Sequence, residues 1–545
     1  MEDILIKNGM VMDGTGNPAV RADVLIHGDR ILDVGILSEA GNSNVIDAEG
    51  LAVAPGFIDA HTHLDFFLPS PRHAEVLKTW AFQGVTTIVA GNCGWSPAPI
   101  DHTMEEDVST YWNFAHPRDG LEYEWTTMRE YLDFLERNGQ ALNVAILTGF
   151  NILRTNAMGG FFAQLANPKE IAEMKRMLKE SLEAGSIGLS LGLFYCPGIF
   201  SNTDELMKLA SAMKEFGAPL VPHTRGLTVT YDKAVEEVIQ IAESNKLPLQ
   251  ISHHAGGTMG DMTIRDRALK AIKEAMDRGV EIGHDNIPWA CGPTTVLALL
   301  PPWLFDGGVK KGLDRLRNPD IRRQTVHELK THVPTWPTWE NRWWTDKFLG
   351  FSSLYAGFRK EGNTRFENMS MQDIAQELNQ DPYDALFDLL IEEEGRLFMI
   401  GGLFDDPMGD DFIAFLLTDP NCSIISDIVG ADFKHGNPAA CGAFTKVLGY
   451  FARDRGVMTQ EEAVRRMTSL PAKQMGLKDR GIIKKGAFAD IAIFDPNTVN
   501  NRASFKDPYQ LSEGVEYLFI NGKLILDKGN YRTDALAGQV IRGNW

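Results

Sequence analysis

Residues 219–254 read PLVPHTRGLTVTYDKAVEEVIQIAESNKLPLQISHH, and they hold one full repeat of the pattern that decides the fold. A short apolar run at 219–225 is followed by a segment at 231–244 whose apolar residues recur at helical spacing. A second short apolar run follows at 248–254. A strand, a helix and a strand in this order are typical of a parallel βα unit.

The same alternation continues on both sides of this unit. Strand-like and helix-like segments take turns in VTTIVAG (85–91), IAEMKRMLKESLEAG (171–185), SIGLSLG (186–192), TDELMKLASAMKEFG (203–217), RALKAIKEAMDRG (267–279) and VEIGHD (280–285). Many consecutive βα units suit an α/β fold, either a (β/α)8 TIM barrel or an open doubly wound sheet.

The two ends of the chain have a different texture. Residues 1–54 and 475–545 consist of short strand-like runs broken by turn signals, such as ADVLIHGDRILDVG and VEYLFINGKLILDKG. We expect these two segments to form one small composite β domain. The βα units between them, at 55–474, would then form the main domain.

One segment interrupts the alternation. Residues 291–402 are rich in Pro, Trp and Gly at first and helical in pattern later, and they include Trp303, Trp336, Trp339, Trp343 and Trp344. A loop of this length without structure is uncommon inside a compact domain, so we expect an inserted subdomain. Its tryptophans fit either an aromatic packing core or a lid that walls an apolar pocket.

The composition excludes several classes of protein. The 545 residues carry 53 Lys and Arg against 73 Asp and Glu, a net charge of −20. Such an acidic chain lacks the basic face that nucleic-acid phosphates need. No secretory signal and no run of roughly 18 apolar residues are present, and the five cysteines are widely spaced. We therefore expect a cytoplasmic enzyme with reduced thiols and no membrane or nucleic-acid partner.

The clearest chemical signal is the pair His61 and His63 in PGFIDAHTHLD (55–65). Because side chains alternate along a strand, both imidazoles point to the same side, as two ligands of one metal ion would. Further candidate ligands stand at the ends of later apolar runs: Cys93, His223, His253, His254 and Asp427. The carboxyl ends of barrel strands collect the active site, so the sequence predicts a metal site there.

Two other motifs are weaker evidence of function than the candidate metal ligands. GLSLG at 188–192 matches the G-x-S-x-G turn of serine hydrolases, but the LFYCPG that follows does not start the helix that the turn requires. Ser190 then fits a packed strand position. No phosphate-binding loop is present, and no helix pattern follows the glycine turn at 14–19, so a nucleotide cofactor is not supported.

In this order, the residues resemble the amidohydrolase superfamily, and more narrowly the N-acyl-D-amino-acid deacylase (D-aminoacylase) group. The matching stretches span almost the whole chain except the insertion: DGTGNPAVRADVLI, PGFIDAHTHLD, VTTIVAGNCGWSPAP, GLSLGLFYCPG, PHTR, LQISHH, SDI and GAFADIAIFDP. The resemblance implies a (β/α)8 TIM barrel with a small β-sandwich built from both termini, 1–54 plus 475–545. Homo-oligomers are common in this superfamily, so one is compatible with the resemblance.

The resemblance also implies roles for the candidate residues. His61, His63 and Asp427 would bind one metal ion, and Cys93, His223 and His253 would hold a more tightly bound zinc ion, with Cys93 able to bridge. One zinc ion or two would thus serve as cofactor. The residues expected to line the substrate site are Tyr195, Arg225, His254, Ile287 and Trp289. Zinc would generate hydroxide from water at neutral pH, and Asp427 would act as general base and then as general acid.

Departures from the group bear on the substrate. The deacylases carry a lysine, a tyrosine and an arginine that bind the carboxylate of the amino acid. Here Ala255, Ile287 and Ala439 stand at those positions. Without a fixed charge partner, an anionic substrate loses ~10²–10³ in affinity. We therefore expect hydrolysis of a neutral apolar or aromatic amide, carbamate or urea.

Three alternatives stay open at this point. The enzyme could be an N-acyl-D-amino-acid deacylase in which Arg225 receives the carboxylate. It could open a cyclic amide or imide with the same metal chemistry. A non-catalytic metal-binding barrel is the third alternative, and the full set of ligand types disfavours it.

Overall fold

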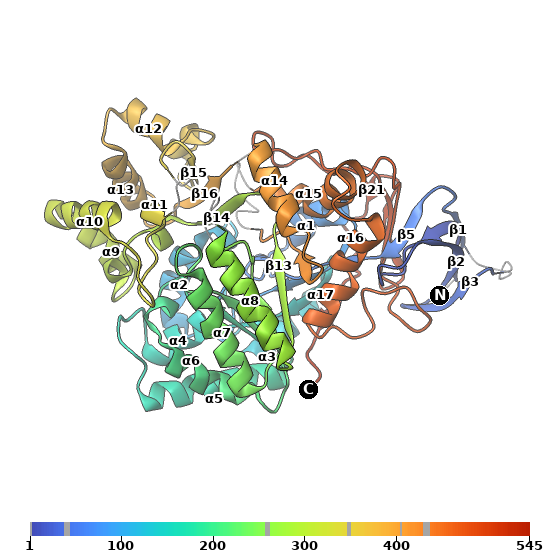
Figure 1. Ribbon diagram of the computed structural model, residues 1–545, viewed down its shortest axis with the longest axis horizontal. Helices are drawn as coiled ribbons and strands as arrows, with labels where there is room; N and C mark the ends of the chain where they lie inside the picture. Colours follow the sequence, from blue (N-terminus) through green and yellow to red (C-terminus); the bar gives the residue numbers. More distant parts are fainter. Residues whose placement is uncertain (1–2, 38–43, 257–261, 346–349, 404–405, 429–436) are drawn as a thin grey trace.

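The computed structural model describes residues 3–37, 44–256, 262–345, 350–403, 406–428 and 437–545. Parallel strands form a ring, and helices alternate with them along the chain (Figure 1). The strands of the ring are β6 (Phe57–Asp59), β7 (Val85–Ala90), β8 (Asn143–Ile146), β9 (Thr148–Gly149), β10 (Leu189–Gly192), β11 (Leu220–His223), β12 (Leu249–Ile251), β13 (Ile282–Asn286) and β17 (Cys422–Ile424).

Every pair of neighbours in this ring is parallel. The short strands β8 and β9 share one position, because β8 pairs with β7 and β9 pairs with β10. The ring closes where the Asp427 backbone N–H donates to the His61 carbonyl oxygen at 3.0 Å and Thr62 bridges Ile428. The predicted (β/α)8 barrel is therefore confirmed, and the open doubly wound sheet is excluded.

Helices lie between the strands along the chain. They are α1 (His73–Ala81), α2 (Glu105–Tyr111), α3 (Met128–Asn138), α4 (Phe150–Met158), α5 (Pro168–Ala184), α6 (Thr203–Ala210), α7 (Tyr231–Asn245), α8 (Thr263–Asp277), α14 (Pro407–Leu416), α15 (Ala439–Lys446), α16 (Gln460–Met467) and α17 (Ser469–Gln474). Helix α5 shows how the local sequence sets both ends of a helix. Asn167 and Glu170 form a capping box at its start, and Gly185 ends it at a φ of 115°.

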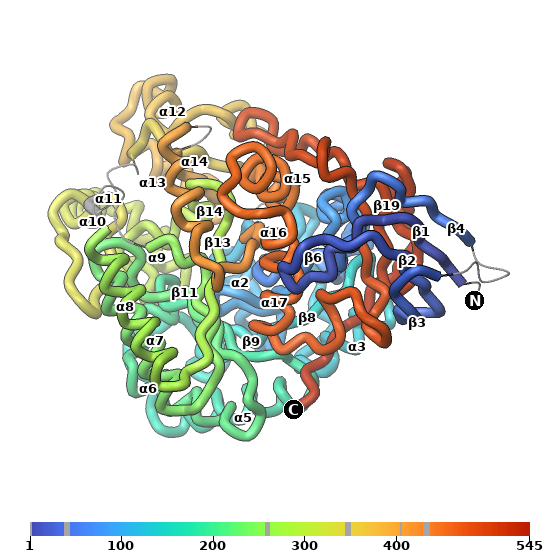
Figure 2. The backbone as a smooth tube through the Cα atoms, turned by 45° about the vertical axis from the view of Figure 1, so that its right-hand side comes forward, coloured from blue at the N-terminus to red at the C-terminus, as the bar shows by residue number. Residues whose placement is uncertain are grey.

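Strands from both ends of the chain form one nine-stranded sheet. Its members are β1 (Ile4–Val11), β2 (Val20–His27), β3 (Arg30–Gly35), β4 (Asn44–Asp47), β5 (Ala52–Pro55), β18 (Ile491–Phe494), β19 (Val515–Ile520), β20 (Lys523–Asp527) and β21 (Asn530–Tyr531). The two ends join where β5 pairs with β18 in antiparallel register. Figure 2 shows the N-terminal strands in blue beside the C-terminal strands in red. The last strand, β22 (Val540–Ile541), pairs with β8 of the barrel.

Between β13 and β17 the chain leaves the barrel and forms a separate layer, seen at the left of Figure 1. Its three-stranded antiparallel sheet pairs Cys291 with Gly402, so the segment departs and returns at one place. The elements of this layer are β14 (Cys291–Thr295), α9 (Val309–Leu316), α10 (Pro319–Thr331), α11 (Arg342–Thr345), β15 (Leu354–Gly357), α12 (Met371–Leu378), α13 (Pro382–Glu392) and β16 (Phe398–Gly402). We call residues 291–402 the insertion.

Three tryptophans of the insertion pack within it. The Trp303 indole donates to Glu328, Trp339 stacks on His332 with ring centroids 5.6 Å apart, and the Trp343 indole donates to the Leu299 carbonyl. These contacts support the packing role rather than the wall of a pocket. The side chain of Trp344 lies outside the described residues. Among the described residues, no helix has both the length and the apolar character that a membrane crossing requires.

Candidate metal centre

Side chains with metal-binding groups gather at the carboxyl ends of five barrel strands. They follow or end β6, β7, β11, β12 and β17, and they are His61, His63, Cys93, His223, His253 and Asp427. These ends are adjacent in the ring or face one another across it, because the strands are all parallel. All six side chains are buried or nearly so.

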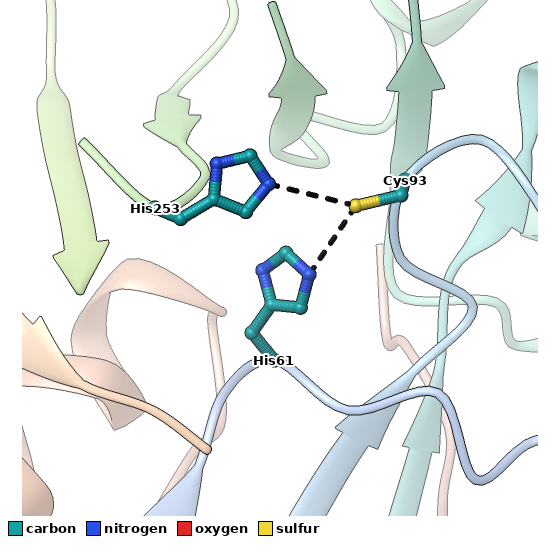
Figure 3. A group of neighbouring side chains, drawn as sticks. All are labelled: His61, Cys93 and His253. Atoms are coloured by element: carbon teal, nitrogen blue, oxygen red, sulfur yellow. Dashed lines mark hydrogen bonds between the residues drawn. The ribbon is translucent and has the colours of Figure 1, made fainter. Parts of the chain in front are cut away.

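Cys93 is the centre of one group (Figure 3). Its Sγ lies 3.4 Å from His61 Nε2, 3.4 Å from His223 Nδ1 and 3.7 Å from His253 Nε2. The donor atoms of His61, Cys93 and His253 lie within 4.8 Å of one another. One thiol and three imidazoles thus converge, which is a donor set that zinc prefers.

Asp427 is the centre of a second group that shares His61. Its Oδ1 lies 3.1 Å from His63 Nε2 and 3.3 Å from His61 Nε2. The donor atoms of these three residues also lie within 4.8 Å of one another. Because His61 belongs to both groups, the arrangement offers two neighbouring positions for a cation.

The backbone at this centre is held in an unusual conformation. Cys93, His253 and Asp427 have positive φ values of 52°, 34° and 45°. For residues other than glycine this region costs about 1–3 kcal/mol each, and such residues cluster at functional sites. The fold therefore holds three of the six side chains in place against the local preference of the chain.

Burial decides the protonation of most groups in the centre. It lowers the pKa values of His63, His223 and His253, so their rings are neutral and keep a lone pair for a cation. Burial raises the pKa of the Cys93 thiol to about 11. Burial also opposes ionisation of Asp427, but His61, His63 and His253 outweigh it and hold its pKa well below the usual range.

His61 differs from the other three imidazoles. Burial opposes its charge, yet Asp427 and Cys93 outweigh this effect and raise its pKa well above the ordinary value. Its ring and the Cys93 thiol therefore carry the protons that a binding cation would displace. The residues present fit a zinc site in the type of their donor atoms, in their number and in the short distances between them.

Aromatic side chains cover the imidazoles, and three of them are not among the residues expected at the site. The Trp112 and Phe114 rings meet the His63 ring at centroid distances of 5.4 and 6.1 Å. On the other side, Phe194 and Tyr195 lie 5.8 and 4.8 Å from the His223 ring. The run YWNF at 111–114, between two strand-like segments, was the signal that could have indicated this wall.

Tyr195 lies where the sequence analysis expects it, beside the candidate ligands. Its hydroxyl accepts a hydrogen bond from Thr294 at 3.2 Å. Burial raises its pKa well above the usual value, whereas the positive charge of Arg342 acts in the opposite direction. The hydroxyl is therefore neutral and can donate a hydrogen bond.

Arg225 and His254 lie in other surroundings than expected. The Arg225 guanidinium is buried, with its Nε and Nη2 each 3.3 Å from a carboxylate oxygen of Glu237. His254 Nδ1 meets the Tyr231 hydroxyl, and its ring packs on His284 with centroids 4.6 Å apart. Both side chains therefore already have partners, and their expected contact with a substrate stays a prediction.

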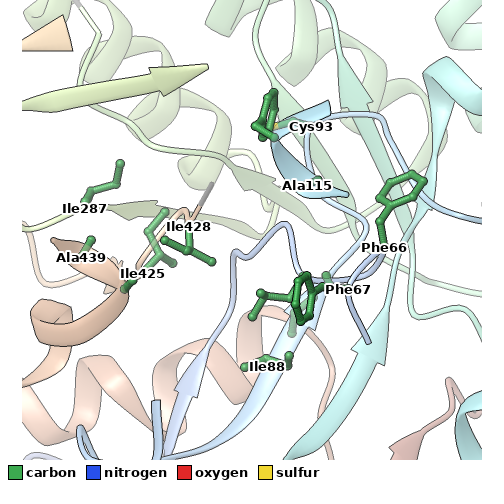
Figure 4. Close-up of a cluster of buried hydrophobic side chains, with 14 of the residues drawn as sticks. Phe66, Phe67, Ile88, Cys93, Ala115, Ile287, Ile425, Ile428 and Ala439 are labelled. Carbon is green, nitrogen blue, oxygen red and sulfur yellow. The ribbon is translucent and has the colours of Figure 1, made fainter. Parts of the chain in front are cut away.

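Ile287 and Trp289 follow β13. Ile287 belongs to a buried apolar cluster with Ile425, Ile428 and Ala439 (Figure 4). The Lys446 ammonium lies 4.3 Å from the centroid of the Trp289 ring and 2.9 Å from an Asp410 carboxylate oxygen. The positive charge of Lys446 is thus matched by the carboxylate of Asp410.

The insertion is attached to the barrel beside this centre. The buried Glu340 carboxylate accepts hydrogen bonds from the Leu227 N–H at 2.5 Å and from the Thr228 N–H and hydroxyl at 2.9 and 2.7 Å. Leu227 and Thr228 belong to the loop that follows the candidate ligand His223. Two residues beyond Glu340, Arg342 starts α11. The insertion therefore brings a positive charge toward Tyr195.

Comparison with known proteins agrees with this geometry. A model of the amidohydrolase family matches residues 44–292 and 417–526. A D-aminoacylase of Alcaligenes xylosoxydans xylosoxydans is 30% identical over 99% of this chain and 97% of that protein. An N-acyl-D-glutamate deacylase of the same organism is 32% identical over 95% of this chain and 93% of that protein.

A solved structure shows the same similarity in three dimensions. The N-acyl-D-glutamate deacylase from Bordetella bronchiseptica, complexed with zinc and a phosphonate mimic of the tetrahedral intermediate, matches with a TM-score of 0.79. The two chains are 27% identical, and the match covers 99% of each.

Proposed function

Because this chain belongs to the amidohydrolase family, we propose that it hydrolyses a linear amide-type C–N bond of a neutral apolar or aromatic substrate. The chain is a hydrolase that acts on carbon–nitrogen bonds other than peptide bonds. The observation that carries the proposal is the convergence of six metal-binding side chains at the carboxyl ends of the barrel strands. The same zinc chemistry in the similar deacylase supports it.

Two groups of residues would hold the cation. Cys93, His223 and His253 would hold one zinc ion, and His61, His63 and Asp427 would hold a second where one is bound. When bound, zinc activates water and polarises a carbonyl group. The buried aromatic wall around the imidazoles excludes bulk water and strengthens the electrostatic interactions inside.

Asp427 is the group that would move the proton. Its carboxylate is ionised and lies 3.1 Å from His63 Nε2, so it can accept a proton from the attacking water. The same carboxyl would then protonate the leaving nitrogen, because an amine leaves poorly as an anion. The neutral Tyr195 hydroxyl, beside His223, would donate a hydrogen bond to the substrate carbonyl oxygen.

The choice of a neutral substrate rests on the residues around the centre. Ile287 and Ala439 are buried within an apolar cluster, and Ala255 is half-buried beside His254. Nearby Arg225 is paired with Glu237, and Lys446 is paired with Asp410. An ionised carboxylate that entered among Ile287, Ala439 and Ala255 would lose its hydration without gaining a partner from Arg225 or Lys446.

One comparison of rates tests the proposal. The ratio kcat/KM is measured on the zinc-loaded protein for an N-acyl-D-amino acid and for a neutral arylamide with the same acyl group. We expect the neutral amide to win by at least tenfold, or about 1.4 kcal/mol of transition-state binding. We also expect chelation to abolish turnover and zinc to restore it. Full turnover in metal-stripped protein would contradict the mechanism.

A second candidate function is deacylation of N-acyl-D-amino acids. The names of the similar proteins favour it, and so does the charge of Arg342 that acts on Tyr195. If the D-amino-acid derivative is the better substrate, this function replaces the neutral amide. Arg342 is then the first residue to substitute.

A further inference from the structure

Asp285 is a buried carboxylate that lies directly behind two of the candidate ligands. It stands on β13, and its side chain is fully buried. Its Oδ1 accepts a hydrogen bond from the His253 backbone N–H at 2.6 Å and lies 3.8 Å from His61 Nδ1. The expected set of site residues does not include it, although it ends the strand-like segment VEIGHD at 280–285.

The position of Asp285 matches the needs of His61. The Nε2 atom of His61 faces Cys93 and Asp427, so a cation would bind at that nitrogen. The proton of the neutral ring must then sit on Nδ1. Among the described residues, Nδ1 has no partner within hydrogen-bond distance, and the carboxylate of Asp285 is the acceptor that lies on that side. A carboxylate at this place fixes the tautomer and makes the opposite nitrogen a better ligand.

Asp285 also supports His253, through the backbone instead of the ring. His253 has a φ of 34°, which residues with a side chain rarely adopt. Its N–H donates to the side-chain Oδ1 of Asp285, and the neighbouring His254 N–H donates to the backbone carbonyl oxygen of Asp285 at 2.8 Å. These two bonds hold the turn that aims the His253 ring at Cys93.

The carboxylate itself is fixed in place. Its second oxygen accepts a hydrogen bond from Gln250 Nε2 at 2.9 Å, and Gln250 lies on the adjacent strand β12. Its backbone lies in the parallel pairing of β13 with β17, opposite Ser423. The carboxylate of Asp285 therefore cannot turn away from the two histidines without losing its hydrogen bonds to Gln250 and to the His253 N–H.

We propose that Asp285 is a positioning residue that orients His61 and His253 together for binding of the metal ion. This inference rests on the metal centre of the proposed function, but it concerns affinity for the ion and not the choice of substrate. One oxygen atom would serve both groups of donors, because His61 belongs to both and His253 to the Cys93 group. Loss of the carboxylate should weaken both groups at once.

The test compares metal binding in Asp285→Asn and Asp285→Ala with the parent protein. Zinc affinity is measured by competition with a chelator, and cobalt-substituted protein is examined by visible absorption, which reports the ligand geometry around the ion. We expect zinc to bind 10–100-fold more weakly in both variants, with Asp285→Ala the weaker of the two, and the cobalt bands to shift. Asp285→Glu should restore part of the affinity.

A matched control is available beside the same strand. Asp419, which lies just before β17, accepts a hydrogen bond from His284, the residue before Asp285, at 3.0 Å, and this bond involves none of the six candidate ligands. Asp419→Asn should bind zinc as the parent does. If Asp285→Ala does not fold, as judged by circular dichroism and thermal unfolding without metal, Asp285→Asn decides the question.

The outcomes separate this inference from the proposed function. If folded Asp285→Asn binds zinc with the affinity and cobalt spectrum of the parent, Asp285 is not a positioning residue, whatever the enzyme hydrolyses. A loss of the same size in Asp419→Asn would show general damage to the barrel and would also overturn the inference. If the parent protein binds no zinc, both the inference and the proposed function fall.

Discussion

The barrel and the insertion meet at the same site but are built in different ways. The barrel places six metal-binding side chains at five strand ends, and the amidohydrolase match covers those strands. The insertion supplies none of the six, and residues 293–416 lie between the two matched segments. The comparison indicates that the candidate metal ligands belong to the barrel, and we expect the insertion to act on the choice of substrate.

The insertion is nevertheless bound firmly to the barrel at two places. Glu340 accepts hydrogen bonds from the loop after β11, as described above. On the other side, the Arg118 guanidinium donates to the Phe358 carbonyl at 2.5 Å, and Arg359 donates to the His116 carbonyl at 2.8 Å. The candidate metal ligands thus lie in the barrel alone, although hydrogen bonds join the two regions. Substitutions in the barrel and in the insertion should therefore have different effects on activity.

The largest effect is expected on the barrel side, from Asp427→Asn. The amide cannot accept the proton of water or return it, so kcat should fall by about 10²–10⁴. The measurement is kcat on the neutral arylamide, together with zinc content to separate loss of the ion from loss of the base. A variant as active as the parent would show that another group moves the proton.

A smaller effect is expected from Glu340→Gln in the insertion. The amide nitrogen would face the N–H groups of Leu227 and Thr228, and a buried donor left without an acceptor costs about 1–3 kcal/mol. We expect kcat/KM to fall about tenfold while zinc content stays that of the parent. Glu328→Gln is the matched control, since Glu328 accepts a bond from Trp303 within the insertion. A drop as large as that of Asp427→Asn, or a loss of zinc, would break the comparison between the two regions.

The difference between barrel and insertion also explains which features could be predicted from the sequence. The barrel follows from repeated strand and helix patterns, and each repeat needs only local spacing. The candidate ligands follow because His223 ends a strand and the others lie within a few residues of one. His61 and His63 lie beyond the end of β6, yet the bridge at Thr62 keeps that stretch extended, so the alternation argument still holds.

What the sequence does not reveal depends on contacts between distant segments. His253 and His254 are neighbours of the same type, and only the positive φ of His253 separates their directions. From the sequence Arg225 looks available, but in the structure it pairs with Glu237, which lies nearly two turns into α7. Glu340 reaches a loop more than 110 residues earlier in the chain. No periodicity in the sequence encodes pairings of this kind.

A third variant, Arg342→Met, sharpens the role of the insertion in selectivity. Arg342 acts on the Tyr195 hydroxyl, and removal of its charge should disfavour anionic substrates more than neutral ones. We expect the ratio of kcat/KM for the N-acyl-D-amino acid to that for the neutral arylamide to fall about fivefold, or ~1 kcal/mol. Arg317→Met, at an exposed position after α9, is the control and should leave the ratio unchanged. An unchanged ratio in Arg342→Met would remove the insertion from charge selection.

The last expected effect is on stability instead of activity, and it reports whether the insertion keeps its contact with the barrel. His116 lies under Arg359, and burial together with Arg359 and Arg396 lowers its pKa to about 3. The folded protein keeps this ring neutral, whereas the unfolded chain takes up a proton below its ordinary pKa of 6.5. The stability from His116 is therefore fully present above pH 6.5 and is lost as the pH falls toward 3, by about 2 kcal/mol at pH 5.

His116→Gln cannot titrate, so the difference in free energy of unfolding between parent and variant should shrink by that amount between pH 7 and pH 5. Urea unfolding at several pH values measures it, and the exposed His327→Gln should follow the parent throughout. Parallel profiles for parent and His116→Gln would mean that water reaches this histidine and that the insertion does not seal the barrel there.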